Sequence, residues 1–220
     1  YAEDHYMSET LILLIPFIGT ALGAAMSLFF RRGLSLRAEK VFLGFAAGVM
    51  TAAAVWSLLI PALDSAESCL PVVSGFLVGV GFLLLLDMII PHLHLESESP
   101  EGLPVKLPRR TMLLLAVTLH NIPEGMAVGV ALAGSLSESA ISTSSALVLS
   151  LGIALQNFPE GAVVSMPLLG EGMSRKKAFF CGVLSGAVEP VAALATLFFT
   201  RELSSVLPFL LSFAAGAMLY

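Results

Sequence analysis

The sequence predicts an all-α polytopic membrane protein, and three observations lead to that fold class. Of the 220 residues, 57% are hydrophobic and only 12% are charged, whereas a soluble domain usually carries about a quarter charged residues. Six apolar runs are each long enough to cross a bilayer as a helix. The basic residues fall almost entirely on one side of those runs.

The apolar runs define the expected elements, because a spanning helix needs about 20 apolar residues. We expect spans at residues 10–30, 38–62, 71–92, 110–134, 143–169 and 177–200, with an incomplete seventh run from about 204. From Ser204 to the end, a helix would cover only about 25 Å at 1.5 Å per residue. We therefore expect 1–220 to be one transmembrane domain that is shortened at its C-terminus. The Glu- and Pro-rich stretch 93–109 is expected to be a solvated loop.

The basic residues set the expected orientation. Ten of the eleven fall on one side of the predicted spans, and only Arg201 falls on the other. Because cytoplasmic loops carry the excess of Lys and Arg, we expect the N-terminus outside the cell and the 93–109 loop in the cytosol. The net charge of −5 and the clustering of the bases argue against a nucleic-acid partner. The ten residues are Arg31, Arg32, Arg37, Lys40, Lys106, Arg109, Arg110, Arg175, Lys176 and Lys177.

Two pairs of internal repeats point to a transporter. The segment HNIPEG at 120–125 resembles QNFPEG at 156–161, and FAAGVM at 45–50 resembles FAAGAM at 213–218. Within each pair the two predicted helices run in opposite directions across the membrane. Inverted repeats of this kind are typical of transporters, which bind substrate near the midplane at the repeat interface. For the second pair, chance is the alternative, since Ala and Gly are common in membrane helices.

Polar residues gather inside three predicted spans. Charged residues at a helix centre cost at least about 2.5 kcal/mol each, and no Lys or Arg lies in the central part of any span. A bound metal ion is the simplest counter-charge. The set of imidazole, carboxylate and amide groups suits zinc and its first-row neighbours. The candidate ligands are His120, Asn121, Glu124, Gln156, Asn157, Glu160 and Glu189.

Depth and helical spacing support one shared site. At 1.5 Å per residue, His120 lies about 15 Å from the predicted cytosolic end of its helix, and Glu189 about 18 Å from that of its own. Both depths fall near the middle of a hydrocarbon core of about 30 Å. His120 and Glu124 are four residues apart and share one helix face, as do Gln156 and Glu160.

Each candidate ligand also has a structural alternative. Asn121, Asn157 and Gln156 could form hydrogen bonds between helices without touching metal. Glu189 could be a structural or proton-carrying carboxylate. Met50 lies in mid-helix and could be a thioether ligand or a packing residue.

Two further groups of residues stand near the predicted helix ends. Asp87, His92 and His94 lie at the cytosolic end of the third span, where they would form a metal exit path or simply a wetted helix end. Asp64 and Glu67 lie at the outer end of the second span, where they would attract cations to an entrance or simply be solvated.

At this point the motifs resemble a known family. HNIPEG at 120–125, QNFPEG at 156–161 and the pair Glu189-Pro190 together resemble the ZIP (Zrt/Irt-like) divalent metal transporters, with the GufA-like branch as the best fit. GFAAGVM at 44–50 and LLDMIIPHLH at 85–94 also resemble that branch, and the likeness covers nearly the whole chain.

The resemblance implies a fold and an activity. It implies a bundle of eight transmembrane helices, about six and a half of them present here, with an inverted repeat around helices 4 and 5. It implies transport of zinc, and variably cadmium, iron or manganese, toward the cytosol by alternating access with an elevator-type motion. It also implies a homodimer in the cytoplasmic (inner) membrane.

The resemblance also implies two metal sites. The first maps onto Met50, His120, Glu124, Gln156 and Glu160, and the second onto Asn121, Glu124, Asn157, Glu160 and Glu189. Some family members carry an acidic residue where this chain has Asn157. A neutral oxygen there implies a weaker second site.

Other classes of protein fit the sequence less well. An intramembrane metalloprotease would need HExxH on one helix, and neither HExxH nor GxSxG occurs, so we expect no enzyme. A metal sensor or scaffold could bind at lower cost in a loop. A channel-like conductor stays an open alternative to a carrier.

Overall fold

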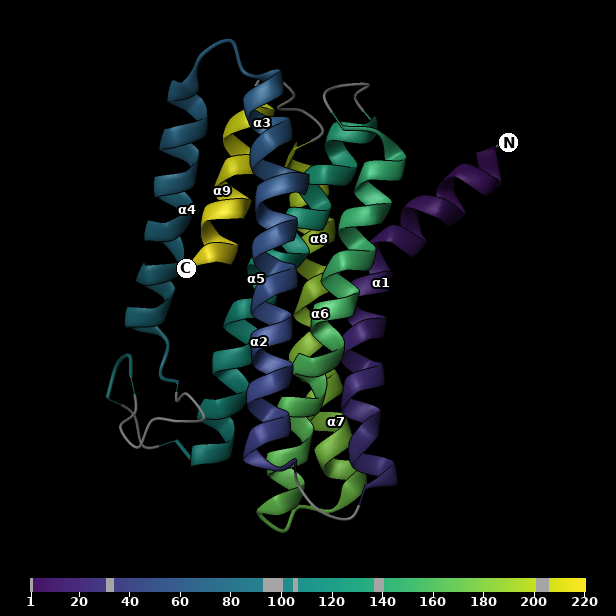
Figure 1. Ribbon diagram of the computed structural model, residues 1–220, viewed down its shortest axis with the longest axis vertical. Helices are drawn as coiled ribbons and strands as arrows, with labels where there is room; N and C mark the ends of the chain where they lie inside the picture. The colour runs from purple at the N-terminus through teal and green to yellow at the C-terminus, as the bar shows by residue number, and fades with distance from the viewer. Residues whose placement is uncertain (1, 31–33, 93–100, 105–106, 137–140, 201–205) are drawn as a thin grey trace.

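The structure is a computed structural model that describes residues 2–30, 34–92, 101–104, 107–136, 141–200 and 206–220, with only the backbone for residues 2–8. Its described residues form a bundle of helices whose axes run along the long axis of the molecule (Figure 1). The helices are α1 (Ala2–Phe29), α2 (Leu36–Ala52), α3 (Ile60–Ser65), α4 (Cys69–Ile89), α5 (Arg109–Leu136), α6 (Thr143–Gly170), α7 (Arg175–Gly186), α8 (Val188–Thr200) and α9 (Leu207–Leu219), with a π-helical segment η1 (Ala53–Leu59) between α2 and α3.

Six helical stretches are long and apolar enough to cross a membrane. They match the six predicted spans to within three residues at each end, which confirms the all-α fold class. The shorter α9 covers the seventh run. The stretches are Glu9–Phe29, Leu36–Ser65, Cys69–Ile89, Arg109–Leu136, Thr143–Gly170 and Arg175–Thr200.

Two of the spans are irregular. The second contains η1, and π-helical turns are often found at functional sites. The sixth breaks at Ala187 between α7 and α8, and Pro190 follows, which has no N–H to continue the helical hydrogen bonds. The break places Glu189 in the first turn of α8.

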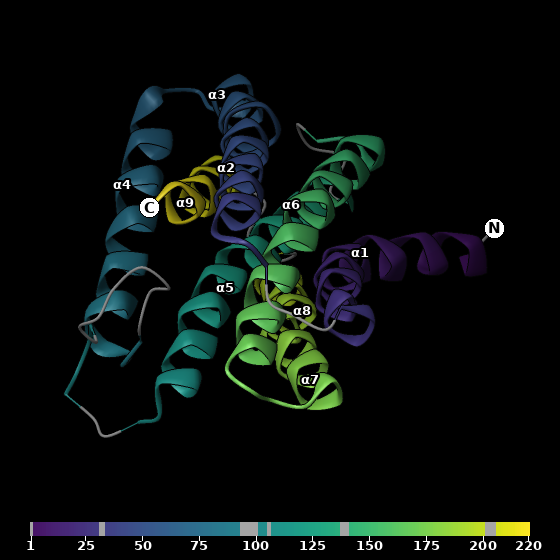
Figure 2. The same cartoon turned by 60° about the horizontal axis from the view of Figure 1, so that its bottom comes forward.

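Close helix pairs position the two central helices, α5 and α6. Figures 1 and 2 show α1 along α6, α8 along α5, and α9 along α4. A Cβ atom on Gly161 of α6 would collide with the carbonyl oxygen of Thr20, and one on Gly125 of α5 would collide with that of Glu189. Glycine at these two positions therefore lets α1 and α8 approach the central helices at backbone distance.

A proline strengthens the pairing of α1 with α6. Pro16 has no N–H, so the carbonyl oxygen of Ile12 loses its helical donor. The hydroxyl of Ser150 on α6 donates to that oxygen at 2.6 Å. The bond gives the buried carbonyl oxygen a donor and fixes the position of the two helices relative to each other along their axes.

The largest apolar core fills one half of the bundle. It takes residues from α1, η1, α5, α6 and α9, among them Ile12, Leu58, Leu132 and Ile153. On α5 these residues follow Glu124, and on α6 they precede Gln156. The core therefore lies between the polar motifs and the end of the bundle that carries α3.

Candidate metal centre

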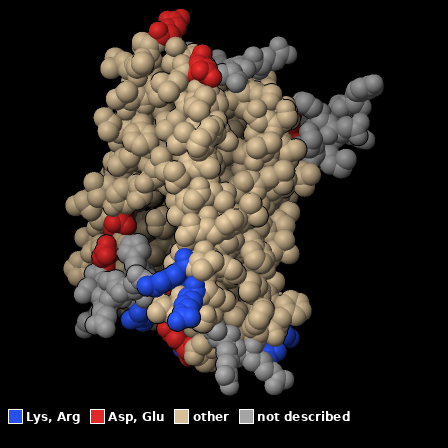
Figure 3. All heavy atoms as spheres, in the orientation of Figure 1, with Lys and Arg blue, Asp and Glu red and all other residues tan. Residues whose placement is uncertain are grey.

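A cavity occupies the other half of the bundle. It has a volume of about 440 Å³ and is lined by α2, α5 and α6. Its lining runs from Leu43, Leu113 and Leu168, nearest the basic end of the bundle, to His120 and Glu160. The face drawn in Figure 3 carries Lys and Arg only in its lower part, which is this basic end. The cavity thus leads from the basic end to the polar motifs.

Three candidate ligands line the deep part of the cavity, and we call them the cavity-facing group: Met50, His120 and Glu160. His120 is exposed, and Met50 and Glu160 are partly exposed. The group brings a thioether, an imidazole and a carboxylate to one cavity. Imidazole and carboxylate together are common zinc ligands.

Five other candidates form an interior group behind the cavity: Asn121, Glu124, Gln156, Asn157 and Glu189. Each is at most 1% exposed. The Nε2 atom of Gln156 donates to Oε1 of Glu124 at 2.5 Å, which joins α6 to α5. The Nδ2 atom of Asn121 donates to Oε1 of Glu189 at 3.1 Å, which joins α5 to α8.

The carboxylates of the two groups lie close together. Glu124 interacts electrostatically with both Glu160 and Glu189. Asn157 lies near Glu124 and Glu189, although neither polar atom of its side chain makes a hydrogen bond of good geometry with a described residue. No Lys or Arg occurs in 111–174. Three carboxylates therefore lie close together with no basic residue in this stretch of sequence, and a bound cation would neutralise them.

Five oxygens of the interior group accept no hydrogen bond of good geometry from any described residue. A buried polar atom without a partner costs about 1–3 kcal/mol, so native proteins rarely keep several at one place. Oxygen atoms that have no hydrogen-bond donor are, however, suited to ligate a cation. The atoms are Oδ1 of Asn121, Oε2 of Glu124, Oε1 of Gln156, Oδ1 of Asn157 and Oε2 of Glu189.

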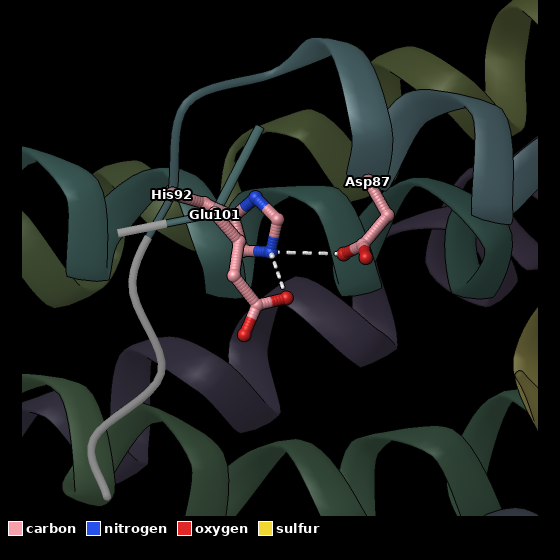
Figure 4. Close-up of side chains that lie close together, drawn as sticks. All are labelled: Asp87, His92 and Glu101. Carbon is pink, nitrogen blue, oxygen red and sulfur yellow. Dashed lines mark ion pairs between the residues drawn. The ribbon is translucent and has the colours of Figure 1, made fainter. Parts of the chain in front are cut away.

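A second cluster lies at the end of α4 (Figure 4). There the Nε2 atom of His92 lies 2.9 Å from Oδ1 of Asp87 and 4.0 Å from Oε2 of Glu101. The Nδ1 atom of the same ring lies 2.8 Å from the carbonyl oxygen of Ile90, which leaves Nε2 directed at the carboxylates. One ligand atom from each of the three residues lies within 4.8 Å of the others. This spacing would let the cluster hold a metal ion.

The remaining predicted site residues lie apart from both clusters. Asp64 and Glu67 are exposed at the α3 end of the bundle, opposite the basic end. His94 lies outside the described residues.

Sequence reasoning missed two residues that touch these clusters. Glu101 joins His92 through a short antiparallel β-bridge, and no local pattern predicts that pairing. The hydroxyl of Thr20 donates to Oε1 of Glu189 at 2.6 Å. Thr20 is a polar residue near the middle of an otherwise apolar run, a signal that could have marked it, although not its partner.

Comparisons with known proteins agree with the motifs. The family model described as "ZIP Zinc transporter" matches residues 96–220. The chain is 36% identical to the human zinc transporter ZIP11, and the alignment covers 91% of this chain and 83% of the relative. It is 37% identical to the zinc transporter GufA of Myxococcus xanthus, over 92% of this chain and 81% of the relative. It is also 36% identical to the zinc transporter ZIPB of Bordetella bronchiseptica, and the alignment covers 93% of this chain and 66% of the relative.

Proposed function

Because this chain belongs to the ZIP zinc transporter family, we propose that it carries zinc across a membrane through the polar site between α5, α6 and α8. Family membership confirms the resemblance predicted from the motifs and makes the chain a multi-pass membrane transporter, not an enzyme. The residues that hold zinc and the path it takes are our proposal.

The observation that carries the proposed site is the set of unpaired oxygens next to the cavity. Zinc held beside His120 and Glu160 also meets one oxygen each of Glu124 and Glu189 that accepts no hydrogen bond of good geometry from a described residue. The ion supplies the positive charge that the helices lack. Because amide oxygens are weak neutral ligands beside imidazole and carboxylate, we expect the site to release zinc as well as bind it.

We propose transport toward the cytosol because the resemblance to the family implies it. By the positive-inside rule we assign the basic end to the cytosol, and the apolar core closes the opposite half. The structure then represents an inward-open state, and alternating access requires a second state that opens toward the α3 end. The elevator-type motion implied by the family is part of the same proposal; α4 packs chiefly against α9, and α9 packs in turn against α5 and η1.

Residues beyond the central site extend the path. We assign Asp87 and His92, together with Glu101, to the exit on the cytosolic side, because their ligand atoms converge. We assign Asp64 and Glu67 to the entrance, because exposed carboxylates at the α3 end attract cations.

The finer features implied by the family are part of the same proposal. The donor set also suits cadmium, iron and manganese as alternative substrates, and competition with zinc uptake tests each of them. The cytoplasmic membrane is proposed from the family branch. The homodimer is proposed from the family resemblance, and the contact we would test first is Gly44 and Gly48 of α2, where an added Cβ atom would meet no described atom within 4 Å. Absence of cross-links between Gly44→Cys copies would count against that dimer surface.

The test is zinc uptake by the purified protein in liposomes that hold a zinc-sensitive dye. We expect saturable uptake that Glu160→Ala abolishes. The matched control is Glu171→Ala, because Glu171 is an exposed carboxylate that pairs with Arg110 away from the site. Uptake in Glu160→Ala equal to that of the parent would show that the assigned site is wrong.

A further inference from the structure

The side chain of Glu189 is held from one side only. Its Oε1 atom accepts hydrogen bonds from the Thr20 hydroxyl at 2.6 Å and from Nδ2 of Asn121 at 3.1 Å. Its Oε2 atom accepts no hydrogen bond of good geometry from a described residue, although the side chain of Asn157 lies near the carboxylate. The carboxylate is therefore fixed with one oxygen bound to protein and the other directed away from those donors.

The amide of Asn121 is oriented by the same network. Its Nδ2 atom donates one hydrogen to Oε1 of Glu189 and the other to the carbonyl oxygen of Ser185 at 3.0 Å. Both acceptors require the nitrogen at that position, so the amide cannot be flipped without losing both bonds. The Oδ1 atom is left facing away from them, and it has no described donor.

Thr20 is placed for this contact by close packing. It is 1% exposed, and a threonine inside a helix often bonds to a carbonyl of its own helix. The Thr20 hydroxyl instead reaches α8. A Cβ atom on Gly186 would lie 2.7 Å from Cγ2 of Thr20 and 3.0 Å from Oε1 of Glu189. Glycine at 186 thus leaves room for the two side chains to meet.

We propose that Thr20 is a positioning residue for transport, whose hydroxyl holds Glu189 and, through it, Asn121, so that one bare oxygen of each faces the zinc ion. The inference rests on the proposed function, since it assumes that Glu189 and Asn121 contact the ion. The role assigned to Thr20 is the hydrogen bond to Glu189, not ligation of zinc. Its contribution is to fix the geometry of two ligands, a carboxylate and an amide, before the ion arrives.

The experiment is calorimetric titration of the purified protein with zinc. Removing a group that orients a metal ligand typically lowers affinity about 10- to 100-fold, and we expect that loss in Thr20→Val for the zinc ion held by Glu189. Thr20→Ser keeps the donor and is expected to bind like the parent. Ser27→Ala is the matched control, since Ser27 is also buried on α1 but donates within its own helix, to Ala24, at 2.8 Å.

Two results would overturn the positioning role. One is parental zinc affinity in Thr20→Val, and the other is a Thr20→Ser variant as weak as Thr20→Val, because the role requires only the hydroxyl. Unfolding of the metal-free variants is measured alongside, and Thr20→Ala replaces Thr20→Val if the valine variant does not fold.

The same variants separate this inference from the proposed function. If Glu160→Ala loses uptake while Thr20→Val binds zinc like the parent, only the positioning role fails. If Glu160→Ala keeps parental uptake, the proposed site itself fails, whatever Thr20→Val does.

Discussion

The HNIPEG copy on α5 and the QNFPEG copy on α6 place equivalent side chains in different surroundings. At the first position, His120 is exposed in the cavity whereas Gln156 is fully buried. At the glutamate, the order is reversed: Glu160 lines the cavity and Glu124 is buried at 1% exposure. Each copy therefore supplies one residue to the cavity-facing group and two to the interior group, Asn121 and Glu124 from α5 and Gln156 and Asn157 from α6.

This difference follows from the inverted arrangement of the repeat. Two helices that carry one motif in opposite directions present opposite ends of it to the same cavity. An ion in the cavity-facing group can exchange ligands with water, whereas an ion in the interior group must pass that group first. We infer that the two groups differ in how fast zinc enters and leaves, although each contains at least one motif glutamate.

The largest effects are expected from the two motif glutamates, and Glu124, the buried one, should matter as much as Glu160. Glu124→Ala removes a carboxylate that lies close to both other glutamates and leaves the amide of Gln156 without its acceptor. We expect zinc uptake in liposomes to fall at least about 100-fold, which corresponds to about 2.7 kcal/mol. Uptake near the parental rate would mean that the interior group does not handle zinc. Glu171→Ala again serves as the control.

Substitutions at the first position of the two motifs, His120 and Gln156, should have different effects on zinc binding and on folding stability. His120→Ala removes an exposed imidazole, so we expect a KM for zinc about tenfold higher with little change in unfolding, since exposed substitutions usually stay within about 0.5 kcal/mol. Gln156→Ala leaves Oε1 of Glu124 without its donor, and we expect a loss of about 1.5–3 kcal/mol of stability. Thermal unfolding of the metal-free proteins and uptake kinetics measure the two effects. If both variants changed KM and stability alike, the division into two groups would be wrong.

A smaller effect is expected from Asn157, the residue after Gln156 in the second motif. Asn157→Asp replaces a neutral ligand with an anion beside Glu124 and Glu189, so it should strengthen binding of a second zinc ion about tenfold. Calorimetry would show a second binding step at lower zinc concentration than in the parent. Two equally tight sites in the parent would contradict the expectation that Asn157 weakens the second site.

Most of the fold could be predicted because the bilayer sets it. Span length follows from the hydrocarbon thickness, so the apolar runs located the six spans closely. The π-helical turns of η1 and the break at Ala187 were missed. Both are local changes of backbone hydrogen bonding inside apolar sequence, and only Pro190 hinted at the second.

The candidate site was partly predictable for a similar reason. The fixed geometry of a helix places His120 near Glu124 and Gln156 near Glu160 from spacing alone. Which of these residues face the cavity depends on how α2 packs against α5 and α6. That packing cannot be predicted from residue spacing in the sequence. The contact of Thr20 with Glu189 joins residues 169 positions apart, so it required the packed structure.

The central claim is that zinc occupies the space between the cavity-facing and interior groups. The position of the ion in the protein tests this most directly, and anomalous X-ray scattering at the zinc edge would locate it in crystals grown with zinc. We predict the strongest peak within bonding distance of Glu124 and Glu160. A zinc peak found only at Asp87, His92 and Glu101, with none among the motifs of α5 and α6, would contradict the account.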